Sequence, residues 1–138
     1  TNIPADKITA GTEDLSPSFC TIYPTFTVTD WSKAETEVMP VLTEATKPET
    51  GCIYHGWSLN KDDNKLICRE AYVDGDAVNT HIANALPALG AALGSGVLKM
   101  ESLVVTGPAD QLEIAKQSCD ALGAVYQQTI GGFSRFSM

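Results

Sequence analysis

The chain has 138 residues, of which 43% are hydrophobic and 19% charged, a balance that predicts one soluble globular domain with a single core. Its formal net charge of -8 argues against binding to nucleic acid or to an anionic membrane surface, because both need clustered Lys and Arg. No apolar run approaches the roughly 20 residues that span a bilayer.

The N-terminal part divides into an arm and a strand. Residues 1–18 are rich in Thr, Asp and Pro and predict an extended arm that precedes a domain over residues 19–138. Residues 19–28 alternate as in a β-strand, but Pro24 lies in the middle and cannot donate a ladder hydrogen bond. We therefore expect a bulge or an unpaired position there.

A helix and a hairpin follow. Asp30 is a suitable N-cap for a helix over residues 31–45, which Pro40 should kink or divide. Residues 52–59 and 65–73 predict two strands joined by a polar hairpin loop. In the first of these strands His55 and Trp57 share a face.

The hydrophobic period changes from strand-like to helical at Asp74, which can cap the new helix. The pattern predicts a helix over residues 75–86, and Pro87 should begin a further short helical segment that ends at the glycines near residue 95. Residues 97–106 predict a fourth strand. A helix from Pro108 to Leu122 and a short strand over residues 124–129 complete the chain.

This order predicts an α+β fold, a ferredoxin-like βαββαβ unit with an extra C-terminal helix and strand. Helices in such a unit cover one face of the sheet, and the other face meets water or a partner. The open face carries few charges, so we expect it to dock on a second copy of the chain as a homodimer.

The four cysteines form no C-x-x-C pair and no zinc-ligand spacing with histidine, so buried free thiols are expected; a disulfide cannot be assigned from spacing. No basic segment followed by an apolar core opens the chain, so no signal peptide is expected. The start at Thr1 is compatible with a removed leader or a trimmed chain. Cytoplasmic and organellar locations therefore both stay open.

Five segments, spread over a stretch of roughly residues 19–106, carry a resemblance to a known family: 21–27, 50–54, 69–74, 80–82 and 98–108. Through them the chain resembles the antibiotic biosynthesis monooxygenase family of dimeric α/β barrels. The resemblance implies a small oxygenase that acts on an electron-rich ring without a cofactor, a haem-linked enzyme, or a relative that only binds a ligand. The haem-degrading branch has Asn on the first strand, then Trp and His on the helix, and this chain departs at all three positions, with His81 and Ala91 at the helical ones.

His81 is the leading catalytic candidate. On a helical wheel it borders the apolar stripe, so its imidazole can reach a pocket between helix and sheet and act as a base near neutral pH. The alternative is a structural histidine bonded to a backbone carbonyl. Tyr72, at the end of the third strand, can orient a substrate hydroxyl or stabilise an oxyanion, or simply fill the core.

The predicted substrate-binding residues are Phe26, Trp57, Asn84 and His55. The two aromatic rings would wall the pocket or fill the core, and Asn84 would hydrogen-bond the ligand or lie exposed. His55 could pair with His81 on a metal, but without a positioned carboxylate this signal is weak, and no metal is expected. Arg69 and Glu70 are adjacent on a strand and must point to opposite faces.

The leading functional hypothesis is a cofactor-independent monooxygenase-like enzyme that acts on a small hydrophobic phenol- or quinol-type molecule. The alternatives are a non-catalytic module that binds a small ligand and a structural or assembly dimer of the same fold. A pocket of about 300 Å³ or more beside His81 would favour an enzyme or a binding module over the structural dimer.

Overall fold

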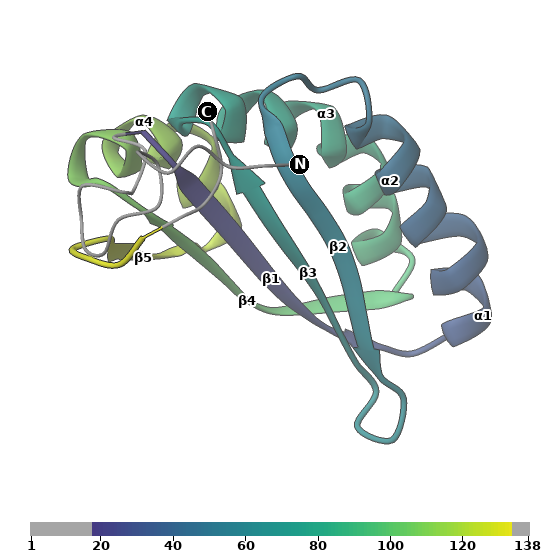
Figure 1. The fold of residues 1–138 in the computed structure, drawn as a ribbon. Helices are drawn as coiled ribbons and strands as arrows, with labels where there is room; N and C mark the ends of the chain where they lie inside the picture. Colours follow the sequence, from purple (N-terminus) through teal and green to yellow (C-terminus); the bar gives the residue numbers. More distant parts are fainter. Residues whose placement is uncertain (1–17, 134–138) are drawn as a thin grey trace, which may run out of the picture.

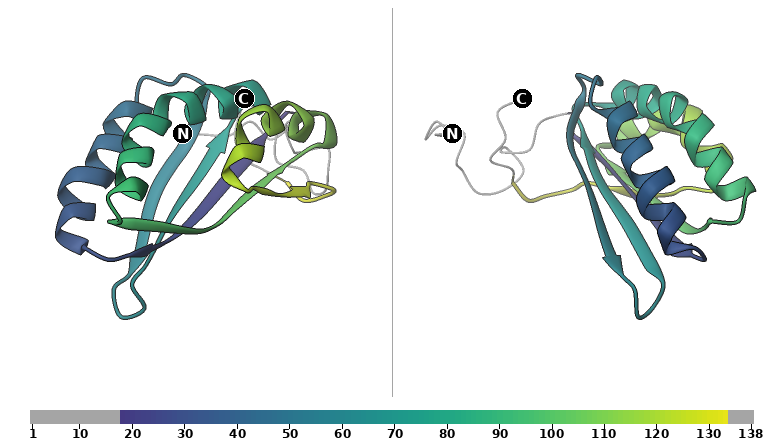
Figure 2. Two further views of the ribbon diagram at one scale, coloured as in Figure 1. Left: turned by 180° about the vertical axis from the view of Figure 1, so that it is seen from behind. Right: turned by 90° about the vertical axis from the view of Figure 1, so that its right-hand side faces the viewer.

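The computed structural model describes residues 18–133, which form a five-stranded sheet with helices packed on one face (Figures 1 and 2). The strand order is β2-β3-β1-β4-β5, antiparallel except for the β4–β5 pair. The predicted ferredoxin-like α+β fold with an added helix and strand is confirmed. The strands are β1 (Cys20–Val28), β2 (Cys52–Asn60), β3 (Lys65–Tyr72), β4 (Leu98–Gly107) and β5 (Val125–Gln128).

The helical segments connect these strands, and none of those described is long and apolar enough to cross a bilayer. Residues 1–17, most of the predicted N-terminal arm, lie outside the described part of the chain. The segments are α1 (Trp31–Lys33), η3 (Ala34–Val38), α2 (Met39–Thr46), α3 (Gly75–Gly94), α4 (Ala109–Cys119) and η4 (Asp120–Leu122).

The two predicted effects of proline on the first strand and the first helix are both present. In β1 the register with β4 shifts between Thr25 and Phe26, directly after Pro24. Asp30 caps α1 by accepting from the Lys33 N–H at 3.0 Å. The helix then widens through η3 just before Pro40, which lies in the first turn of α2, because proline offers no N–H to continue the regular ladder.

The prediction that Pro87 separates two helical segments is wrong, because α3 runs unbroken for 20 residues. Pro87 and Ala83, whose carbonyl loses its partner at the proline, are both exposed, so water can satisfy that carbonyl. The buried stripe of α3 continues through Leu89 to Ala92 and holds both halves of the helix on the sheet. The predicted cap is confirmed, since Asp74 accepts from the Ala77 N–H at 2.7 Å.

The hydrophobic core lies between the helices and the sheet. One cluster gathers around Phe26 and Leu42 near α2, and another around Ile22 and Val78 near α4. Among residues 18–133 only three polar or charged residues are buried, namely Thr46, Glu70 and His81. Buried polar groups need hydrogen-bond partners, so these three residues mark a candidate site between α2, α3 and the sheet.

Candidate functional site

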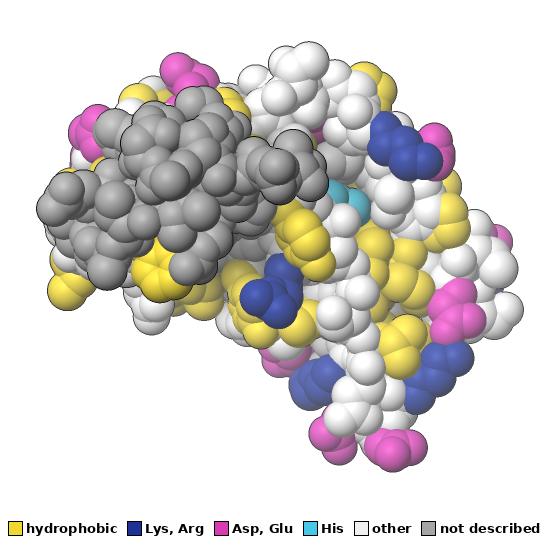
Figure 3. Space-filling model, viewed as in Figure 1, with side chains coloured by type: hydrophobic (Ala, Val, Ile, Leu, Met, Phe, Trp, Pro, Cys, Tyr) yellow, Lys and Arg dark blue, Asp and Glu magenta, His cyan; other side chains and the backbone are white. Residues whose placement is uncertain are grey.

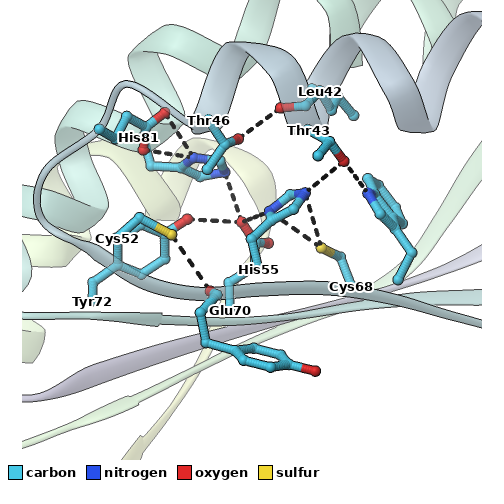
Figure 4. Close-up of polar contacts among 12 residues, drawn as sticks. Leu42, Thr43, Thr46, Cys52, His55, Cys68, Glu70, Tyr72 and His81 are labelled. Carbon is cyan, nitrogen blue, oxygen red and sulfur yellow. Dashed lines mark hydrogen bonds and ion pairs between the residues drawn. The ribbon is translucent and has the colours of Figure 1, made fainter. Parts of the chain in front are cut away.

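A buried carboxylate, that of Glu70, forms the centre of the site (Figure 4). Glu70 lies on β3, points to the helices and is only 5% exposed. Three groups approach its Oε1 atom: the Tyr72 hydroxyl donates at 2.7 Å, His81 Nε2 lies at 2.8 Å and His55 Nδ1 at 3.4 Å. The strand geometry explains this, because Glu70 and Tyr72 alternate onto one face and His55 is opposite Glu70 on β2.

His81 reaches this carboxylate from α3 and lies between two acidic side chains. Its Nε2 faces Glu70, and its Nδ1 lies 3.0 Å from Oε1 of Glu49 in the loop after α2. Asn84, one turn further along α3, donates to Glu49 Oε2 at 2.8 Å and to the Ala45 carbonyl at 2.7 Å. With an acceptor at each nitrogen, the ring carries both protons and is an imidazolium.

The pKa shifts follow from this arrangement. Burial alone would lower the pKa of His81, but Glu70 and Glu49 outweigh it and raise that pKa. Burial alone would raise the pKa of Glu70, but hydrogen bonds from His55 and His81, the His81 charge and the Tyr72 hydroxyl bring it down to about 2. Glu70 is therefore ionised at neutral pH despite its burial.

His55 is the second imidazole at Glu70 and has a different environment. Its Nε2 lies 3.2 Å from the Thr43 hydroxyl of α2, which also accepts from Trp57 Nε1 at 3.0 Å. Since Thr43 accepts from Trp57, its own proton is free to point at His55 Nε2. This assignment places the ring proton on Nδ1, toward Glu70, and a lone pair on Nε2.

The cysteines are free thiols, as expected. Cys20, Cys68 and Cys119 are buried, and Cys52 is partly exposed. Burial raises the pKa of the Cys68 thiol, and the same cause raises that of the Tyr72 phenol. Cys68 Sγ lies 3.7 Å from His55 Nδ1, so one thiol belongs to the site.

The cavities at the site differ in size and position. The cavity that touches His81 and Glu70 from the α3 side is about 30 Å³, too small for a substrate and far below the roughly 300 Å³ expected beside His81 for an enzyme or a binding module. A pocket of about 250 Å³ lies between α2 and β2 and reaches His55. It is lined by Thr43, Thr46, Lys47, Glu49, Cys52, Ile53, Tyr54 and His55.

The open face of the sheet holds a third, wider hollow of about 560 Å³. Arg69 points to this face, opposite to Glu70, as predicted from their adjacent positions on β3. The same hollow is lined by Tyr23 and Tyr54, whose side chains are exposed. The visible part of the open face accordingly combines hydrophobic and basic side chains (Figure 3).

The structure gathers five of the six predicted site residues into one network, which Trp57 joins by donating to Thr43, and leaves Phe26 in the hydrophobic core. His81, Tyr72 and His55 contact Glu70, and Asn84 joins through Glu49. Phe26 is 1% exposed and packs against Trp57, with ring centroids 6.5 Å apart. The catalytic and substrate-binding roles of all six stay predictions.

Sequence reasoning missed Glu70 as the centre, and it missed Glu49 and Thr43 altogether. One signal for Glu70 was present: it occupies an inward position between Cys68 and Tyr72 in the alternation of β3. A carboxylate on the core side of a strand needs partners, and the histidines are the natural ones. Glu49 and Thr43 carry no such signal, because they lie in a turn and on a helix whose approach to β2 is a tertiary feature.

The fold matches solved structures, although no protein family model and no curated protein sequence matches the chain. MupZ from Pseudomonas fluorescens superposes with a TM-score of 0.73 at 24% identity, over 85% of this chain and 94% of MupZ. SnoaB, a cofactor-independent oxygenase from Streptomyces nogalater, has a TM-score of 0.55 at 21% identity, over 64% and 90%.

A protein from Bacteroides thetaiotaomicron described as a possible oxidoreductase gives a TM-score of 0.54 at 16% identity, over 64% of this chain and 96% of that protein. At these identities the comparisons establish the fold. The fold expected from the resemblance to antibiotic biosynthesis monooxygenases is thereby confirmed, since a cofactor-independent oxygenase shares it. Function has to be argued from the site itself.

Proposed function

We propose that this protein is a cofactor-independent, monooxygenase-like enzyme that acts on a small phenol- or quinol-type molecule. The observation that carries the proposal is the buried Glu70 carboxylate, which orients His55 at the wall of the pocket between α2 and β2. SnoaB, a cofactor-independent oxygenase with this fold, supports the reaction class. A base near neutral pH is what such chemistry requires of the protein.

His55 is the proton acceptor in this proposal. Both nitrogens of His81 face carboxylates, so its ring has no free lone pair. His55 Nε2 instead faces the Thr43 hydroxyl at the pocket wall, in the place that a substrate hydroxyl would take or contact. His81 then keeps Glu70 ionised and in position, and Tyr72 fixes the same carboxylate by donating to it.

The remaining pocket residues suit a small aromatic phenol. Ile53 provides an apolar wall, and the Lys47 ammonium, which pairs with Glu44, also lines the pocket and can turn to a phenolate. The deprotonated substrate supplies its own electrons to oxygen: a phenol and O₂ give a quinone and water, as a ring C–H becomes the second carbonyl and the two hydrogens lost leave in the water. The pocket volume of about 250 Å³ favours a molecule of one or two rings.

Oxygen uptake measures this activity directly. With a panel of one- and two-ring phenols and hydroquinones, we expect the wild-type protein to consume oxygen and His55→Gln to lose about 100-fold in rate, the usual effect of removing a general base. The control Glu101→Gln, at an exposed position on β4, should keep the wild-type rate. Equal rates for His55→Gln and wild type would remove His55 from the mechanism, and ligand binding without uptake would favour a binding module.

The homodimer is part of the same proposal, because the helices leave one face of the sheet open (Figure 2). Sedimentation at micromolar concentration should give twice the 14.7 kDa protomer mass. Tyr23→Lys combined with Tyr54→Lys should produce protomers, since both exposed rings lie on the open face. Val41→Lys, at an exposed position on α2, is the matched control and should remain dimeric. A wild-type protein that sediments as a protomer would contradict the dimer.

A further inference from the structure

We propose that His55, Cys68 and Glu70 form a binding site for a zinc-like divalent cation. Two of the distances between their ligand atoms are 3.7 Å, from His55 Nδ1 to Cys68 Sγ, and 3.4 Å, from His55 Nδ1 to Glu70 Oε1. All three ligand atoms lie within 4.8 Å of one another. Zinc bonds of about 2.0–2.3 Å at tetrahedral angles place ligand atoms about 3.3–3.7 Å apart, so both distances from His55 Nδ1 already suit such an ion.

The register of two strands creates this triangle of nitrogen, sulfur and oxygen. Cys68 and Glu70 are two residues apart on β3, so both project toward the helices. His55 on β2 is directly opposite Glu70. Trp57, two residues further along β2, is opposite Cys68. Ligands carried by paired strands are held more rigidly than ligands on loops, which favours a defined metal geometry.

The neighbouring groups are those that commonly support metal ligands. A histidine that binds metal through one nitrogen usually donates its other N–H to a fixed acceptor, and His55 Nε2 lies 3.2 Å from the Thr43 hydroxyl. Glu70 is oriented by the Tyr72 hydroxyl and by His81. Two of the three ligands, His55 and Glu70, are thus pre-positioned by hydrogen bonds that do not involve the cation.

The chemistry of the ligands selects the type of cation. Imidazole and thiolate favour Zn²⁺ or a similar transition metal, whereas Mg²⁺ and Ca²⁺ need oxygen ligands. Glu49 and Glu70 share only one imidazolium, His81, so one carboxylate charge at the site is uncompensated. A divalent cation bound with the Cys68 thiolate would balance it, and binding would release the thiol proton.

The site also has a route from solvent and room for a fourth ligand. The side chains of Cys68 and Glu70 are buried, but that of His55 is 10% exposed and lines the pocket between α2 and β2. Three protein ligands leave one tetrahedral position, which water or a small molecule can occupy from that pocket.

Metal binding and the base role of His55 exclude one another, a consequence that rests on the proposed function. A cation on Nδ1 forces the ring proton onto Nε2, which then donates to Thr43 and accepts no proton from a substrate. Zinc should therefore inhibit oxygen uptake. The binding itself does not depend on catalysis.

Cobalt(II) titration of the reduced protein tests the site, because a Co²⁺–thiolate bond gives a charge-transfer absorption. We expect one equivalent to bind, zinc to displace it, and Cys68→Ser and His55→Gln each to lose the band. Cys119→Ser, which alters a distant buried thiol, should keep it. Thermal unfolding of each variant checks that it folds.

Absence of the band in wild type, its persistence in Cys68→Ser, or its loss in Cys119→Ser would overturn the metal site. If zinc displaces the cobalt and removes the band but oxygen uptake is undiminished, His55 is not the base and the metal site is still supported. A protein that takes up oxygen but binds no cobalt would contradict the metal site and leave the proposed function supported. The two proposals therefore fail separately.

Discussion

Replacing Glu70 by alanine is expected to lower the free energy of unfolding by about 3–5 kcal/mol, the range seen when one partner of a buried charged network is removed. Glu70 is the shared acceptor for His81 and Tyr72 and the ion-pair partner of His55. Without it, a phenol that is 0% exposed and a buried imidazolium both lose a partner, and no water can easily replace the carboxylate.

Two further substitutions turn this into a graded test. Glu70→Gln keeps the shape and one acceptor oxygen but loses the charge, so we expect its free energy of unfolding to lie between those of wild type and Glu70→Ala. Glu101→Gln removes an exposed carboxylate on β4 and should leave the free energy of unfolding close to that of wild type. Urea unfolding measures all three. A value for Glu70→Ala within the range of the Glu101 variant would show that the network adds no stability.

Replacing His81 by alanine is expected to lower the free energy of unfolding by a similar amount, about 3–5 kcal/mol, and the loss should depend on pH. The imidazolium lies between Glu49 and Glu70, so its removal leaves two buried carboxylates without a cation. Protonation of one carboxylate then removes the repulsion between the two buried negative charges, so the pKa of Glu70 in the variant should rise far above its wild-type value.

The direction of the pH effect follows from linkage. In wild type the pKa of Glu70 is lowered from 4.5 to about 2, so its contribution to stability is present above 4.5 and is lost as the pH falls toward 2. In His81→Ala a raised pKa has the opposite effect, with stability present at low pH and lost as the pH rises. The difference between the two proteins should therefore be larger at about pH 7 than at about pH 4.

Asn84→Ala provides the matched control for this pH dependence. It removes a neutral donor to Glu49 from the same face of α3 and should cost about 1 kcal/mol with little change between the two pH values. Urea unfolding of both variants at both pH values gives the comparison. A pH-independent loss in His81→Ala would mean that the carboxylates are well solvated without the imidazolium.

Local signals in the sequence were sufficient for the elements and for their order. Alternation identified β3, the period change at Asp74 placed the start of α3, and the short hairpin loop made β2 and β3 neighbours. Pro87 shows where local reasoning failed, because the buried stripe of α3 outweighed the missing hydrogen bond. Helix continuity there depends on packing against the sheet, which is not a local property.

The fold and the inward direction of His81 can be derived from the amino-acid pattern alone, because both follow from periodicities carried by neighbouring residues. Which imidazole keeps a free nitrogen follows instead from contacts between elements that are distant in the chain. That outcome depends on Glu49 and Thr43 approaching from separate elements to within hydrogen-bond distance of His81 and His55. Hydrogen bonds between side chains distant in the sequence leave no periodic signal, so the chemistry of this site could not be derived before its geometry was known.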